Sequence, residues 1–223
     1  MTQTKLPPFP HFWLFLASIV AGATFWAASH LGVSSPLFIV WKGAGVGLLA
    51  LCAGLTARER NGWLITAVLA MGTLGDVLLE TSGIVIGAAA FLAGHLVSIL
   101  LYLLNRRHDG GVVAIAIALA VPVAAFAITH DLSATVYAAG LGGMAGAAWY
   151  SRFPRKIVAV GALMFVASDL LIFAGLGPLK DSALPGLGLT IWPLYFAGQA
   201  LIAYGVIRTL EARKRNEDLH HRL

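Results

Sequence analysis

Eight apolar stretches, each about as long as a membrane-spanning helix, follow one another along the chain. A helix needs roughly 20 apolar residues to cross the hydrocarbon layer of a bilayer. Stretches of that kind lie at 12–32, 36–56, 62–80, 84–104, 111–129, 133–150, 155–175 and 191–210. Only 11% of the residues are charged, against about 25% in soluble domains. The sequence predicts an all-α membrane protein of eight transmembrane helices, with one membrane domain at 1–210 and a charged cytoplasmic tail at 211–223.

Basic residues occupy every second connection between these stretches. They are Arg58 and Arg60, then Arg106 and Arg107, then Arg152, Arg155 and Lys156, and finally Arg208, Arg213, Lys214, Arg215 and Arg222. Basic connections stay in the cytoplasm, so the pattern predicts cytoplasmic termini and, most simply, a bacterial inner membrane. The net charge of +5 belongs to these connections and does not predict a nucleic-acid partner. Residues 12–32 have an alternative interpretation as a cleaved signal peptide, which the prolines preceding them disfavour.

The third and seventh stretches resemble each other, and so do the fourth and eighth. The matched residues are Met71, Gly75 and Asp76 with Met164, Ser168 and Asp169, and Phe91-Leu-Ala-Gly-His95 with Tyr195-Phe-Ala-Gly-Gln199. Units with an even number of spans have the same orientation in the membrane. The matches predict two four-helix repeats in parallel orientation. The alternative is chance similarity among helices rich in small residues.

Carboxylates are the costliest residues inside the predicted spans. A charged side chain at the bilayer centre costs about 2.5 to 3.5 kcal/mol, and is therefore usually paired or functional. Asp76 and Asp169 lie at matching depths in the outer halves of their spans, and Glu80 lies one turn after Asp76. Lys42 lies in the outer half of the second span, and we expect it to be a cation beside these carboxylates. Alternatively, Glu80 and Lys42 reach the headgroups.

Uncharged polar side chains form two further groups. His95, Ser98 and Tyr102 share one face of the fourth span, and Tyr195 and Gln199 lie one turn apart on the eighth. The spans at 111–129 and 133–150 have few interior polar groups and are expected to act as scaffold. The histidines lack the spacing of a zinc motif, so no metal or cofactor is predicted. Buried carboxylates, a histidine and hydroxyls are typical of acid/base chemistry.

Five short segments occur in a characteristic order along the chain: Trp41-Lys42, Gly75-Asp76-Val-Leu-Leu, Phe91-Leu-Ala-Gly-His95 with Tyr102, Gly161-Ala-Leu-Met-Phe-Val-Ala-Ser-Asp169 and Tyr195-Phe-Ala-Gly-Gln199. In this ordered set the sequence resembles the YhhN-like family of membrane proteins, which includes lysoplasmalogenases. The resemblance implies a lysophospholipid substrate and hydrolysis of its vinyl ether bond, which releases a fatty aldehyde. We expect Asp76 and Asp169 to share acid and base catalysis in an unknown order. Lys42, Glu80, His95, Ser98, Tyr102, Tyr195 and Gln199 are the expected supporting residues.

Two other classes of function remain open. Repeats with polar residues near the membrane midplane also occur in transporters. Transporter sites often lie at broken helices, but Pro122 and Pro193, the prolines closest to span interiors, neighbour neither aspartate. The other alternative is a structural membrane subunit in which the polar groups only join helices.

Overall fold

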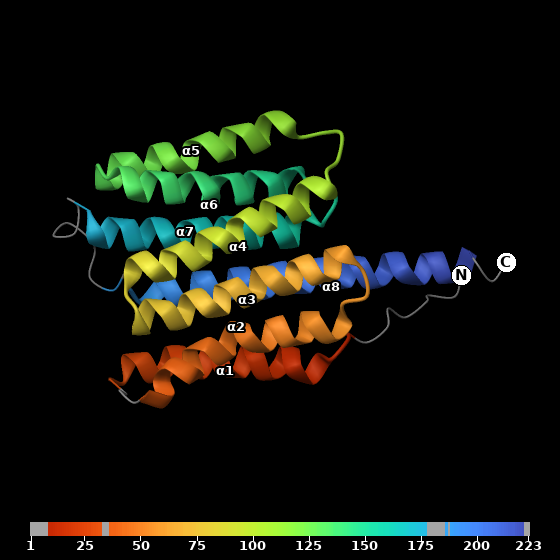
Figure 1. Cartoon of the computed structure of the whole chain (residues 1–223), viewed down its shortest axis with the longest axis horizontal. Helices are drawn as coiled ribbons and strands as arrows, with labels where there is room; N and C mark the ends of the chain where they lie inside the picture. Colours follow the sequence, from red (N-terminus) through yellow and green to blue (C-terminus); the bar gives the residue numbers. More distant parts are fainter. Residues whose placement is uncertain (1–8, 33–35, 178–185, 187, 221–223) are drawn as a thin grey trace.

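The computed structural model describes residues 9–32, 36–177, 186 and 188–220. Its helices are α1 (Phe12–His30), α2 (Pro36–Thr56), α3 (Arg60–Thr81), α4 (Ile84–Leu104), α5 (Gly111–Thr129), α6 (Leu132–Tyr150), the short π-helix η1 (Arg155–Ala159), α7 (Val160–Leu176) and α8 (Gly188–His220). The long helices lie side by side along one direction (Figure 1). Within the described residues every regular element is helical, so the predicted all-α class is confirmed.

Seven helices of the described chain are long and apolar enough to cross a membrane, if η1 and α7 are taken as one. Their length and composition fit an integral, multi-pass membrane protein. Helix α6 is not among the seven, because its sequence is rich in glycine, alanine and hydroxyl residues rather than in large aliphatic ones. Small residues let helices approach closely. Consistent with this, a Cβ atom at Gly142 would lie 2.9 Å from the Ala118 carbonyl oxygen of α5.

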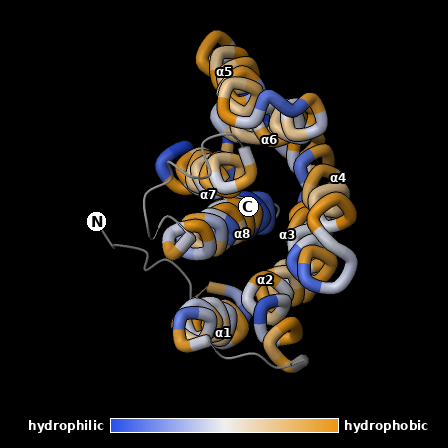
Figure 2. Tube along the Cα trace, turned by 90° about the vertical axis from the view of Figure 1, so that its left-hand side faces the viewer, coloured by the Kyte–Doolittle hydropathy of each residue, from blue (hydrophilic) through white to orange (hydrophobic). Residues whose placement is uncertain are grey.

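The helices form an arc around an inner pair. Contacts run from α1 to α2, α3, α4, α6 and α5, so these six helices form a continuous curved row, which we call the arc. Helices α7 and α8 pack against each other and against the concave side of the arc, and we call them the inner hairpin. The view along the helices shows this arrangement (Figure 2). The candidate site described below lies between the arc and the inner hairpin.

The connections that carry arginines meet at one end of the bundle. Arg107 Nε donates to the Ser151 carbonyl oxygen at 2.6 Å, which joins the α4–α5 connection to the segment between α6 and η1. Asn105 donates to Asn61 of α3 at 3.0 Å and accepts from Arg213 of α8 at 2.7 Å. We call this the basic end. Helix α8 continues to His220, beyond the predicted end of its span at residue 210, and projects past the bundle (Figure 1).

The two halves of the chain pack differently. Helix α3 packs against α4, and α7 packs against α8, as two matched pairs would. The first four helices are consecutive neighbours in the arc, whereas α5 and α6 complete the arc and α7 and α8 leave it. The parallel repeat, the crossing of the membrane by α6 and the side on which the termini lie remain predictions.

Candidate active site between the arc and the inner hairpin

Asp76 is a buried carboxylate of the arc that is held by the inner hairpin. It lies in the last third of α3, and only 2% of its surface is exposed. The Tyr195 hydroxyl of α8 donates a hydrogen bond to Asp76 Oδ2 at 2.7 Å. This bond joins one predicted site residue of the first half of the chain to one of the second half. A buried carboxylate with a single hydroxyl donor keeps its other oxygen available for a reactant.

Asp169 has a matching arrangement on the inner hairpin. It lies on α7 with 6% of its surface exposed. The Tyr137 hydroxyl of α6 donates to Asp169 Oδ2 at 2.7 Å. His95 Nε2 of α4 lies 3.3 Å from the same hydroxyl oxygen. Three helices therefore supply a continuous chain of polar groups, His95–Tyr137–Asp169.

Aromatic rings lie between the two aspartate groups. The Phe165 ring centroid is 5.1 Å from that of His95 and 5.0 Å from that of Tyr195, so Phe165 touches both groups. Phe91 lies edge-on to Tyr195 at 5.7 Å, and Trp192 lies 5.5 Å from Tyr195. The carboxylates thus belong to one apolar, aromatic region, in which electrostatic interactions are stronger than in water.

Gln199 lies one turn after Tyr195 on α8 and is 4% exposed. A Cβ atom at Gly72 of α3 would lie 3.0 Å from Gln199 Nε2 and 3.5 Å from Tyr195 Oη, so the two polar heads meet at this glycine. Gln199 Oε1 is buried and has no hydrogen-bond partner among the described residues. Buried carbonyl oxygens are normally hydrogen-bonded, so this oxygen is a candidate position for a bound donor such as water.

Three of the predicted supporting residues make their hydrogen bonds and ion pairs with groups other than the two aspartates, although Lys42 and Glu80 are close enough to Asp76 to interact with its charge. Lys42 Nζ forms an ion pair with Glu80 Oε1 at 2.6 Å, and the Glu80 side chain is 43% exposed. Ser98 donates to the carbonyl oxygen of Gly94 in its own helix.

Tyr102 is the supporting residue that lies apart from the aspartates. Its ring packs edge-on to Phe153 near the basic end, at a centroid distance of 6.1 Å. The structure therefore brings together Asp76, Asp169, His95, Tyr195 and Gln199. Tyr102 lies near the C-terminal end of α4.

Tyr137 is the site residue that sequence reasoning missed. We expected the span at 133–150 to act as scaffold only, and the hydrogen bond from Tyr137 to Asp169 shows that this was wrong for its first turns. A usable indication was present. Tyr137 comes early in a span that would run inward, and Asp169 comes late in one that would run outward, so their depths match.

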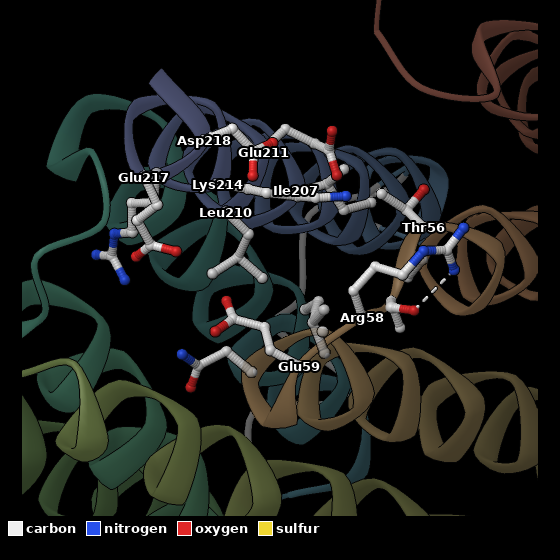
Figure 3. A pocket seen from close by; sticks show the side chains of 15 residues that line it. Thr56, Arg58, Glu59, Ile207, Leu210, Glu211, Lys214, Glu217 and Asp218 are labelled. Atoms are coloured by element: carbon white, nitrogen blue, oxygen red, sulfur yellow. Dashed lines mark hydrogen bonds between the residues drawn. The ribbon is translucent and has the colours of Figure 1, made fainter. Parts of the chain in front are cut away.

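A second polar region lies at the basic end, where a cavity of about 440 Å³ opens between the α2–α3 connection and the extension of α8. The residues that line it include Arg58, Glu59, Glu211 and Lys214, which are labelled in Figure 3. Neither Asp76 nor Asp169 lines it, nor does any of the seven predicted supporting residues. The cavity and the aspartates are therefore separate features at opposite ends of the helices.

Comparison with known proteins relates this arrangement to one family. The model of the YhhN family matches residues 37–206, a range that contains both aspartates and both tyrosines. Proteins named lysoplasmalogenase from Mycobacterium bovis and Mycobacterium tuberculosis are each 35% identical to this chain over 164 residues. The aligned part covers 66% of this chain and 61% of each mycobacterial protein. No solved structure matches the chain. From the extent of the family match, the chain belongs to the YhhN family.

Proposed function

We propose that the protein hydrolyses the vinyl ether bond of lysoplasmalogens, releasing a fatty aldehyde and a glycerophospho-ethanolamine or -choline. The observation that carries the proposal is the pair of buried aspartates, each bonded by a tyrosine hydroxyl at 2.7 Å. Family membership and the name of the two mycobacterial relatives support the same reaction.

Vinyl ether hydrolysis needs two proton transfers and no covalent nucleophile. One acid protonates the vinyl carbon that is not bonded to oxygen, which makes an oxocarbenium ion. One base then removes a proton from the water that attacks this ion. Two carboxyl groups of opposite protonation state supply both steps. Asp76 and Asp169 are the buried carboxylates that the structure places in one aromatic region.

The surroundings of the site suit a lipid with one long chain. Phe91, Phe165 and Trp192 provide apolar surface beside the polar groups, and the alkenyl chain would lie among these rings and the neighbouring helices. In this proposal Lys42, which is paired with Glu80, contacts the phosphate of the headgroup. The ion pair would then open when substrate binds.

We further propose that all eight long helices cross the membrane, with both termini in the cytoplasm. The arginine-rich connections meet at one end of the bundle, and such connections stay on the cytoplasmic side. Asp76 lies near the other end of α3. The site would therefore take its lipid from the outer leaflet, most simply that of a bacterial inner membrane.

The test is aldehyde release from a lysoplasmalogen by the detergent-purified protein. We expect Asp76→Asn and Asp169→Asn each to lower kcat by at least about 100-fold, the usual contribution of a general acid or base. Asp109→Asn is the matched control, because that carboxylate pairs with Arg155 at the basic end, outside the site. Size-exclusion profiles establish that each variant is folded. Absence of turnover by the folded parent, or full activity in both site variants, would refute the proposal.

A further inference from the structure

We infer that the two aspartates have different and fixed roles: Asp169 delivers the proton and is recharged through Tyr137 and His95, whereas Asp76 and Gln199 hold the attacking water. The inference rests on the proposed function, which leaves the acid and the base unassigned. It adds Tyr137 as a proton-relay residue that acts through Asp169 and was not among the site residues predicted from the sequence.

The group around Asp169 consists entirely of side chains that exchange protons. A hydroxyl has one proton, so when Tyr137 donates it to Asp169 Oδ2, its oxygen can only accept from His95 Nε2. A shift of both protons along this chain protonates Asp169 and leaves His95 Nε2 without a proton. The imidazole stays neutral by taking a proton from water at its other nitrogen, Nδ1, and the chain is reset when exchange with water replaces that proton by one at Nε2. The geometry therefore provides a recharging route for an acid at Asp169.

The group around Asp76 cannot do the same. Its tyrosine, Tyr195, neighbours Gln199, and an amide neither gains nor loses a proton in this way. It offers an unpartnered buried acceptor instead, Gln199 Oε1. Since Tyr195 occupies Asp76 Oδ2, a water bound at Oδ1 can direct its second hydrogen to Gln199 Oε1. Asp76 then has the position of a base beside a held water.

The difference between the groups arises from one pair of matched positions. His95 and Gln199 occupy equivalent places in the aligned segments of α4 and α8. Each lies beside a tyrosine hydroxyl that donates to an aspartate. The two tyrosines come from helices that are not equivalent, α6 and α8. The tyrosine bonded to Asp169 thus has a neighbour that relays protons, His95, whereas the tyrosine bonded to Asp76 has one that does not, Gln199.

The assigned roles balance over one turnover. Asp169 gives its proton to the vinyl carbon, whose π electrons form the new C–H bond, and an oxygen lone pair completes the oxocarbenium ion. Water adds to this ion and gives a proton to Asp76, forming a hemiacetal. The C–O bond to glycerol breaks as the glycerol oxygen takes the proton from Asp76 and the hemiacetal hydroxyl loses its proton to water. Asp169 regains a proton from Tyr137, and Tyr137 from His95 Nε2, while His95 Nδ1 takes a proton from water. Exchange with water then replaces the Nδ1 proton of His95 by one at Nε2, which returns the relay to its starting state before the next turnover.

Infrared spectroscopy tests the assignment without relying on activity. Protonated carboxylic acids have a C=O stretching band that ionised carboxylates lack. At neutral pH we expect this band in the parent, its loss in Asp169→Asn and its retention in Asp76→Asn. Tyr137→Phe should shift the band, and Tyr195→Phe should not. Loss of the band in Asp76→Asn alone, or no such band in the parent, would overturn the assignment.

Imidazole rescue tests the relay during turnover. We expect His95→Ala to lose kcat with little change in KM, and imidazole in the buffer to restore at least about tenfold of the loss. Imidazole should not restore the double variant His95→Ala/Tyr137→Phe, in which the chain is broken. Equal recovery in the single and double variants, or none in either, would overturn the relay. A parent that shows the expected infrared bands but no turnover refutes the proposed function and leaves the proton assignment standing.

Discussion

At the scale of single residues, the position of each polar group in the candidate site depends on a neighbour that carries no charge. Gly72 shows this most directly, because it leaves room for the heads of Gln199 and Tyr195. The hydrogen bond between each aspartate and its tyrosine would be lost if the two helices were further apart. Small residues and hydroxyls therefore define the site as much as the carboxylates do.

Gly72→Ala is expected to impair catalysis. The added Cβ would lie 3.0 Å from Gln199 Nε2, so the amide must shift from its present position beside Tyr195. A displaced buried hydrogen-bonding group costs about 1 to 3 kcal/mol, and we therefore expect kcat to fall about tenfold or more. Gly47→Ala is the matched control, since its Cβ would meet only the Thr73 side chain, at ordinary contact distances. Equal kinetics for the two variants would contradict the proposed position of Gln199.

Tyr102→Phe is expected to stabilise the protein. The Tyr102 hydroxyl is buried without a hydrogen-bond partner among the described residues, which costs about 1 to 3 kcal/mol. Removing it should raise the thermal midpoint in detergent, whereas Tyr102→Ala should lower it by removing the ring that packs on Phe153. A lower midpoint for Tyr102→Phe would show that the hydroxyl has a partner. The same variant tests whether Tyr102 supports catalysis, as the sequence predicted.

At the scale of helices, the close crossing of α7 and α8 fixes where Asp169, Tyr195 and Gln199 stand relative to the arc. The two helices meet at Gly161 and Gly198, where a Cβ atom on either glycine would lie under 3 Å from the carbonyl oxygen of the other. Such contacts are possible only without side chains. The inner hairpin is therefore the element whose packing most directly controls the site.

Gly198→Val should separate α7 from α8. Overpacking at a tight contact costs about 1 to 3 kcal/mol, so we expect a lower thermal midpoint and loss of turnover together. Gly175→Val, on the exposed end of α7 with nothing within 4 Å of its Cβ position, should change neither. Unfolding followed by circular dichroism measures the first effect. An unchanged midpoint in Gly198→Val would mean that the helices are not in close contact at this point.

The sequence predicted the bounds of the helices better than it predicted which helices pack against each other. Apolar stretches and the arginines between them located all eight long helices to within a few residues at most boundaries, since length in a membrane is set by bilayer thickness. The charged extension of α8 has no such constraint, and the helix runs on to His220. Pairing between helices depends on tertiary packing, so the approach of Tyr137 to Asp169 was not predictable from periodicity.

At the scale of the whole molecule, the arginine connections and the buried aspartates lie toward opposite ends of the bundle. The connections at the basic end are fixed to one another by hydrogen bonds such as Arg152 Nε to the Arg106 carbonyl oxygen, at 3.0 Å. Asp76, Tyr137 and Tyr195 all lie closer to the other end of their helices. An orientation with the basic end inside would therefore separate the reaction from the cytoplasm.

Single cysteines test this orientation in intact cells. Cys52 is fully buried, so the parent provides an unlabelled background for a thiol reagent that does not cross membranes. Ser82→Cys lies in the α3–α4 connection and His108→Cys in the α4–α5 connection, and both native side chains are exposed. We expect labelling of Ser82→Cys in intact cells, and of His108→Cys only after the cells are opened. The reverse result would place the aspartates toward the cytoplasm, and the lipid would then have to come from the inner leaflet.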